Sequence, residues 1–375
     1  MSNISWAFAA LRLADAPCIK AISSEAIRKL SQLPAPGDGS PQWGGTWGGQ
    51  AVSILGLTEA LSLSGFLDDD FAYEAAACLA RYTSPLDGPA SPPTSAGRGG
   101  ALEAERPGVV LERGHLCVLW KPPGWTVSVA DEAKRDMLDS PCGNADVELG
   151  ERGSGSEFEL QRWVQQAFPN GSRIVKDSSA SHGLVHRLDR NTSGLLLCAK
   201  SYWGYAMTLM QFAAQRISKE YVFLCHGHLP SGLRWIEAPL LRVGPPHAAR
   251  STVSPQGQHA STEVDKVAHL HGAVGEGAFS LVLVRLHTGR LHQIRAHAAH
   301  YGHPLLGDVT YGGKVAVDCP RVFLHAHRLQ VAGLIDGFPN FEVSSPLPQD
   351  LHAVVAKLGA VDSRSGALLS QWTKS

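Results

Sequence analysis

One carboxylate stands out in the segment HGLVHRLDRNTSGLLLCAK, residues 182–200, because arginines flank it closely on both sides. Asp189 lies between Arg187 and Arg190, and the turn-forming run Asn-Thr-Ser-Gly follows before an apolar stretch. A carboxylate held rigidly in such a turn can act as a nucleophile if it stays ionised. The alternative is an aspartate that only accepts hydrogen bonds from the backbone of its own turn. This segment alone leaves both open.

A second segment, RLHTGRLHQIRAHAAHYGHPLLGDVTYGG at residues 285–313, offers a partner for that carboxylate. Its pattern predicts a strand, a glycine turn and a helix that carries His292, Gln293 and Arg295. The guanidinium of Arg295 is a planar fork that can clamp a carboxylate bidentately and leave it ionised. We therefore expect Arg295 to pair with Asp189, the alternative being a helix whose polar face meets solvent.

A third segment, QRISKEYVFLCHG at residues 215–227, places Lys219 and Tyr221 two positions apart on one side of an expected strand. A tyrosine at the end of a strand can stack on a flat ligand while its hydroxyl stays available for hydrogen bonding. Taken alone, a tyrosine such as Tyr221 is more often an ordinary core or surface aromatic.

Together these segments resemble the RluA-type pseudouridine synthases. The resemblance rests on five linked motifs in the order of the family and covers about residues 108–350, leaving residues 1–107 uncovered. The five motifs are VLWKPPGWTV, HRLDRNTSGLL, SKEYVFLCHG, TGRLHQIRAHAAHYGHPLLGDVTYGG and RVFLHAHRLQV.

The resemblance implies an isomerase that converts uridine in rRNA or tRNA to pseudouridine with no cofactor and no metal. It implies that Asp189 is the catalytic aspartate, that Arg295 pairs with it, and that Tyr221 stacks on the target base. It also implies that Arg187 fills the gap left when the uridine swings out of its stack. Which atom Asp189 attacks, or whether it instead deprotonates the sugar, stays open.

The net charge of the chain is −1, so RNA binding requires a local basic surface. Nine cationic residues fall within the motif-bearing segments and could line one cleft: Arg187, Arg190, Lys200, Arg216, Lys219, Arg290, Arg295, Arg321 and Arg328. The residues expected to contact RNA are Arg187, Arg190, Lys219, Arg290, His292 and Gln293. The alternative is that these charges are scattered over the surface.

Two rival functions differ in class from an RNA isomerase. His182 and His186 have the spacing of a zinc-binding helix, but Gly183 stands where the catalytic glutamate of a metal hydrolase would be, and GLVHRL predicts a strand. The other rival is an RNA-binding module that has kept the fold and lost turnover.

Composition limits the remaining possibilities. Seven cysteines without a C-x-x-C pair indicate free thiols in a reducing compartment. The sequence has no run of 18 apolar residues, so it predicts no membrane span. We expect a monomer inside the cell, either cytoplasmic or in an organelle such as a mitochondrion or chloroplast.

The patterning predicts an α+β catalytic domain, in which a mainly antiparallel mixed β-sheet with flanking helices surrounds a central active-site cleft. A small α-helical extension precedes it, and a remnant of helical repeats is one interpretation of this extension. The expected divisions are the helical extension at 1–82, a Pro/Gly/Ser-rich linker at 83–107, the catalytic domain at 108–355 and a tail at 356–375. Within the extension, the Pro/Gly-rich segment 34–50 is expected to lack regular structure.

Overall fold

The structure, a computed structural model, describes residues 16–32, 46–63, 65–83, 105–127, 158–168, 173–245, 248–272, 277–315, 319–333 and 338–373. Most of the expected linker, residues 1–15 and 33–45 of the expected helical extension, and residues 128–157 of the expected catalytic domain lie outside these residues.

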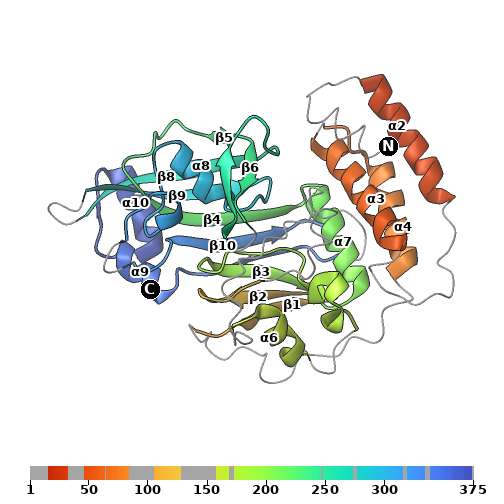
Figure 1. Ribbon diagram of the computed structural model, residues 1–375, viewed down its shortest axis with the longest axis horizontal. Helices are drawn as coiled ribbons and strands as arrows, with labels where there is room; N and C mark the ends of the chain where they lie inside the picture. Colours follow the sequence, from red (N-terminus) through yellow and green to blue (C-terminus); the bar gives the residue numbers. More distant parts are fainter. Residues whose placement is uncertain are drawn as a thin grey trace.

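A ten-stranded sheet forms the centre of the described region (Figure 1). Its strands run in the order β1-β2-β3-β10-β4-β9-β8-β12, with β11 paired to β10 and β5 paired to β8. The β3–β10 pair is parallel and the other pairs of this sheet are antiparallel, so the predicted mainly antiparallel mixed sheet is confirmed. The strands are β1 (Gly108–Arg113), β2 (Leu116–Lys121), β3 (Ser193–Ala199), β4 (Ile217–His226), β5 (Trp235–Glu237), β8 (Ser261–His271), β9 (Ala278–Leu286), β10 (Leu324–Val331), β11 (Phe341–Ser344) and β12 (Gly359–Ala360), and a separate hairpin joins β6 (Leu240–Val243) to β7 (Arg250–Val253).

Helices flank the sheet as predicted. Alternate residues of β4 point to opposite sides, with Tyr221 and Phe223 in one apolar cluster and Val222 and Leu224 in another. The flanking helices are α6 (Leu160–Ala167), α7 (Tyr202–Ala213), α8 (Gln293–His300), α9 (Gln349–Val355) and α10 (Ser363–Thr373), with short 3₁₀ turns at Arg173–Lys176, Ser178–Gly183 and Val309–Tyr311.

The segment expected as a C-terminal tail packs against the sheet. Helix α10 buries Leu368, Leu369 and Trp372 in the cluster that also holds Val222 and Leu224. Strand β12 extends the sheet at the edge of β8. Residues 359–373 therefore contribute to the core beneath the sheet.

Within the described residues, three helices precede the sheet: α2 (Ala16–Ser31), α3 (Thr46–Leu63) and α4 (Asp69–Thr83). Figure 1 shows them together beside α7, which both α3 and α4 contact. The prediction of no regular structure over 34–50 is wrong for 46–50, because α3 begins at Thr46. Burial of Ile54, Leu55 and Leu61 in the main core stabilises this helix, and such packing outweighs the low helix propensity of its glycines.

The strand predicted for GLVHRL is also wrong. Residues 185–189 have no regular structure, and a 3₁₀ turn ending at Gly183 precedes them. Gly183 has φ +83°, and a Cβ built there would lie 2.2 Å from the carbonyl oxygen of Ala199. The chain then meets β3 at an isolated bridge between Leu184 and Cys198 and does not continue as a strand to Asp189.

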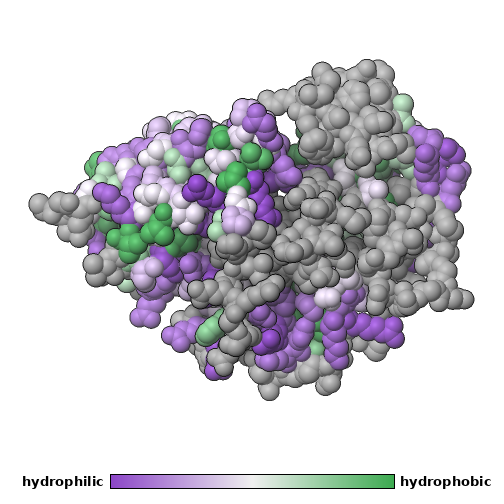
Figure 2. Space-filling model, in the orientation of Figure 1, coloured by the Kyte–Doolittle hydropathy of each residue, from purple (hydrophilic) through white to green (hydrophobic). Residues whose placement is uncertain are grey.

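The surface in Figure 2 shows apolar residues as separate patches among hydrophilic ones. Some exposed apolar surface of this kind is normal for a folded domain. In the described part of the chain, no helix is both long and apolar enough to span a bilayer.

Candidate active site

The turn that carries Asp189 is braced from below by a buried lysine. The Thr192 amide donates to the Asp189 carbonyl at 3.0 Å, which closes the turn just before β3. Lys121, at the end of β2, is fully buried, and its ammonium donates to the carbonyls of Pro122, Arg190 and Thr192 at 3.0, 3.0 and 2.8 Å. The lysine thus stabilises both the entry and the exit of the turn.

A second brace comes from β10 and the residues before it. The Arg321 guanidinium donates to the Asn191 carbonyl at 2.9 Å and to the Ser193 hydroxyl at 3.1 Å. Gly194 has φ +130°, and a Cβ there would lie 2.2 Å from the Ala326 carbonyl oxygen. The glycine therefore permits the parallel contact of β3 with β10 that fixes the position of the turn.

Replacing Lys121 with methionine is expected to lower the free energy of unfolding by about 2–4 kcal/mol, because buried carbonyls lose their donor. Urea unfolding measures this loss, and the hydrogen-exchange rate of the Thr192 amide should rise. The control is Lys200→Met, since Lys200 pairs with the partly exposed Glu112 and its loss should cost about 1 kcal/mol or less. Equal losses in the two variants would contradict the bracing role.

Arg295 lies beside Asp189, with Nη1 3.2 Å from Oδ2. Its bidentate partner, however, is Asp308, which accepts from Nε at 2.8 Å and from Nη2 at 2.9 Å. The Asp308 side chain is fully buried and that of Asp189 is 17% exposed. The Arg295 guanidinium thus binds Asp308 with two nitrogens and Asp189 with the third. The expected pairing of Arg295 with Asp189 is present, but the bidentate clamp is on Asp308.

Tyr311 adds a further layer behind the guanidinium. Its ring lies under Arg295, 5.2 Å from ring centroid to Cζ. Its hydroxyl donates to the Ser251 carbonyl at 3.0 Å and accepts from the Ser251 amide at 2.9 Å. Sequence reasoning assigned no role to Asp308 or Tyr311, although GDVTYG lies in the same segment as Arg295.

The surroundings of Asp189 favour its ionised form. Burial acts to raise the pKa of this carboxyl, but the positive charges of His292, Arg295 and Arg187 together hold it below its ordinary value. The contacts with Asp308 and Asp189 outweigh burial and raise the pKa of Arg295, so the guanidinium stays charged. The turn therefore presents an ionised carboxylate at neutral pH.

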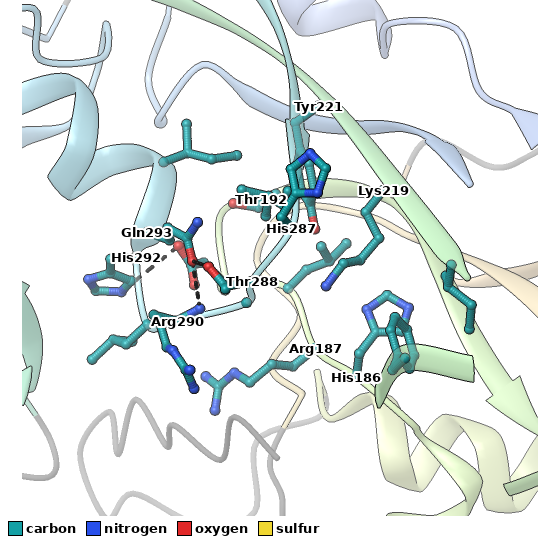
Figure 3. Close-up of a pocket in the computed structure, with 18 of the residues that line it drawn as sticks. His186, Arg187, Thr192, Lys219, Tyr221, His287, Thr288, Arg290, His292 and Gln293 are labelled. Atoms are coloured by element: carbon teal, nitrogen blue, oxygen red, sulfur yellow. Dashed lines mark hydrogen bonds and ion pairs between the residues drawn. The ribbon is translucent and has the colours of Figure 1, made fainter. Parts of the chain in front are cut away.

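Tyr221 extends from β4 into the same pocket (Figure 3). It is 6% exposed, and burial, followed by the negative charge of Asp189, raises its pKa above the ordinary value. The phenol therefore stays protonated and presents an apolar ring with a hydrogen-bonding hydroxyl.

The pocket encloses about 1050 Å³, counting space open to solvent. Four of the nine cationic residues from the sequence line it, namely Arg187, Lys219, Arg290 and Arg295. Figure 3 draws Arg187 and Arg290 on one side of the pocket and Lys219 on another.

The other five cations are not among the residues lining this pocket. Lys200, Arg321 and Arg328 pair with Glu112, Asp350 and Glu342, and Arg190 donates from Nε to the Gly124 carbonyl at 3.2 Å. Arg216 also lies outside the lining. Four of the nine basic residues thus line the pocket, and three form ion pairs elsewhere.

Gln293 lies in the pocket wall, but its amide is committed to the protein. Its oxygen accepts from the Thr288 hydroxyl at 2.7 Å and from the Arg290 amide at 3.0 Å. Its nitrogen donates to the Ser261 carbonyl and the Thr262 hydroxyl at 3.0 and 2.9 Å. These four hydrogen bonds use its full capacity, so Gln293 positions the turn before α8.

His292 precedes α8 in a left-handed conformation, φ 49°. Its Nε2 lies 3.9 Å from Oδ2 of Asp189, and its Nδ1 lies 3.3 Å from the Tyr311 hydroxyl. Its ring therefore links the carboxylate to the tyrosine behind Arg295.

The two histidines considered for a metal site have protein partners of their own. His186 Nε2 accepts from the Leu197 amide at 2.9 Å, while burial, with the nearby charge of Lys219, lowers its pKa to about 3. His182 Nδ1 lies 3.0 Å from the Val175 carbonyl. Across the described ranges, no three His, Cys, Asp or Glu side chains are grouped to hold a metal ion.

Residues 115–300 match the model of the family described as RNA pseudouridylate synthase. An uncharacterised RNA pseudouridine synthase of Chloroflexus aurantiacus is 38% identical over 177 residues, which are 47% of this chain and 53% of that protein. Ribosomal large subunit pseudouridine synthase D of Pasteurella multocida is 33% identical over 191 residues, covering 48% of this chain and 56% of that protein. The chain thus covers little more than half the length of these relatives.

Among solved structures, human RNA Pseudouridylate Synthase Domain Containing 1 aligns with 73% of this chain and 96% of its own. The sequence identity is 22% and the TM-score is 0.48.

Proposed function

The chain belongs, over residues 115–300, to the RNA pseudouridylate synthase family, and from this we propose that the protein isomerises uridine within RNA to pseudouridine. The observation that carries the proposal is Asp189, held ionised at 3.2 Å from Arg295 in a pocket that Tyr221 also lines. A rigid, ionised carboxylate in one pocket with an aromatic ring suits a reaction on one nucleotide.

The reaction is an internal exchange of bonds. The bond from C1′ of the ribose to N1 of uracil breaks, the base turns, and C1′ bonds to C5 instead. The proton on C5 leaves and N1 gains one, so atoms and electrons balance without an added reagent. The carboxylate of Asp189 can serve as the transient nucleophile or as the base that removes a proton.

The remaining pocket residues have distinct proposed roles. Tyr221 stacks on the uracil, and Arg295 keeps Asp189 ionised and oriented. Arg187, Lys219 and Arg290 attract backbone phosphates, with Arg187 also filling the space left by the everted nucleotide. His292 lies beside Asp189, with its Nε2 3.9 Å from Oδ2 of the carboxyl. Arg190 lies outside the pocket lining. Its proposed contact is with RNA that flanks the target nucleotide.

We propose rRNA or tRNA as the substrate class. The test incubates purified protein with each RNA pool and quantifies nucleosides after complete digestion. The expected result is a gain of pseudouridine equal to the loss of uridine. Binding of RNA without any gain in every pool would instead favour an RNA-binding module that does not turn over.

A further inference from the structure

Helix α3 from the N-terminal region contributes one residue to the wall of the pocket. Glu59 lines the same cleft as Arg187, Arg290 and Asp189, although it lies 130 residues before Asp189 in the sequence. Its neighbours fix the helix in place, because the Thr58 hydroxyl donates to the Ile54 carbonyl and lies 3.5 Å from the Met210 sulfur of α7. The position of Glu59 is therefore set by helix packing.

Glu59 is unusual because its carboxyl is almost completely buried. The residue is 4% exposed, and within the described part of the chain its Oε2 has no hydrogen-bond partner. Burial raises the pKa of Glu59 to about 7, while the positive charge of Arg290 opposes the rise. An unpaired acceptor in a buried site is costly, and a donor from a ligand would relieve that cost.

Glu59 and Asp189 line one pocket from different elements, since Glu59 lies on α3 and Asp189 in the turn before β3. Arg290 lines the same pocket, and its charge acts on Glu59. With the base of the target uridine beside Asp189, the nucleotide that reaches Glu59 is a neighbour of the target.

The chemistry of a carboxylate limits what it can contact in RNA. Phosphate diesters offer only acceptors and carry negative charge, so Glu59 repels them. The exocyclic amino groups of cytosine, adenine and guanine are donors, and acidic side chains accept from such groups in nucleic-acid complexes. Arg290, beside Glu59, has the opposite charge and suits the phosphate.

We propose that Glu59 is a specificity-determining residue that accepts a hydrogen bond from the exocyclic amino group of a base next to the target uridine. This inference rests on the proposed function and adds that α3 takes part in choosing the site.

The experiment uses the full-length protein and short RNAs that hold one uridine between positions randomised among adenosine, cytidine and guanosine. Converted RNAs are sequenced for the wild type and for Glu59→Met, which removes both acceptors at similar volume. The wild type is expected to favour a base with an exocyclic amino group at one flanking position by about tenfold over the same base without that group. Inosine in place of guanosine, and purine riboside in place of adenosine, supply the bases without the amino group. In Glu59→Met this difference should fall to within twofold.

Two further variants separate a substrate contact from a structural effect. Glu59→Gln keeps one acceptor oxygen and should retain part of the preference. Glu74→Met makes the same change on α4, where Glu74 is outside the pocket lining, and should leave the preference unchanged.

A parallel selection recovers library RNAs bound by Asp189→Asn protein, so the preference is read without turnover. If no RNA is converted but the bound RNAs show the Glu59-dependent preference, the proposed function fails and this inference stands. If RNAs with inosine or purine riboside at the flanking positions are recovered as well as those with guanosine or adenosine, or if Glu59→Met keeps the preference of the wild type, the inference is overturned.

Discussion

Replacing Asp189 with asparagine is expected to reduce pseudouridine formation by at least about a thousandfold while the fold is retained. The substitution keeps the shape of the side chain and an oxygen that can accept from Arg295, but it removes the negative charge. A neutral amide neither attacks carbon nor accepts a proton at neutral pH, so the chemical step loses its central group. The effect should appear in kcat, with a smaller change in KM.

Stability distinguishes loss of chemistry from loss of structure. The Asp189 side chain is 17% exposed and makes one contact with Arg295, so urea unfolding of Asp189→Asn should shift by about 1 kcal/mol or less. Asp362→Asn is the matched control, because Asp362 lies at the start of α10 and accepts from the Ser365 amide at 2.7 Å. Its activity should stay near that of the wild type. Retained activity in Asp189→Asn would contradict the assignment.

Replacing Arg295 with methionine is expected to lower the free energy of unfolding by about 3–5 kcal/mol and to suppress activity. Asp308 is fully buried and would lose both charge-assisted hydrogen bonds, which leaves an uncompensated carboxylate in the core. Asp189 would lose its nearest positive charge at the same time. Arg328→Met is the matched control, since that guanidinium pairs with the exposed Glu342 and should cost about 1 kcal/mol or less.

The pH dependence of the Arg295→Met variant has a definite sign. In the wild type the folded-state pKa of Asp189 lies below its ordinary value. The ionised carboxylate therefore contributes stability above the ordinary pKa of an aspartate, and this is lost as the pH falls through the folded value. Without Arg295 the pKa of Asp189 rises, so the acid limb of the residual activity should move to higher pH. An unshifted acid limb would show that Arg295 does not control this carboxylate.

The sequence predicted the parts of the site that depend on local pattern. Asp189 in a turn, Tyr221 on a strand and Arg295 on a helix occupy those positions, because turn residues, alternation and helical spacing are local signals. The pairing of Arg295 with Asp308 was not predicted, since one arginine near two carboxylates gives no local sign of which one it clamps. The hydrogen bonds from Lys121 to the turn were not predicted either, because the lysine lies far from the carbonyls of Arg190 and Thr192 in the sequence.

The largest departures arise from contacts between distant segments. GLVHRL alternates like a strand, yet it pairs with β3 through the single bridge of Leu184 with Cys198, next to the close contact of Gly183 with Ala199. Helix α3 begins within a Pro/Gly-rich segment because packing against α7 stabilises it. The position of Glu59 in the pocket follows from the packing of α3 on α7. The spacing of residues in the sequence does not predict that position.

The most direct measurement of the central claim follows tritium placed on C5 of uracil in RNA. Isomerisation must release this label to water, because C5 exchanges its hydrogen for a bond to the ribose. The purified wild-type protein should release one tritium for each pseudouridine formed, and Asp189→Asn should release none above background. Release by Asp189→Asn at the rate of the wild type would contradict the account, and so would an absence of release by the wild type from both rRNA and tRNA.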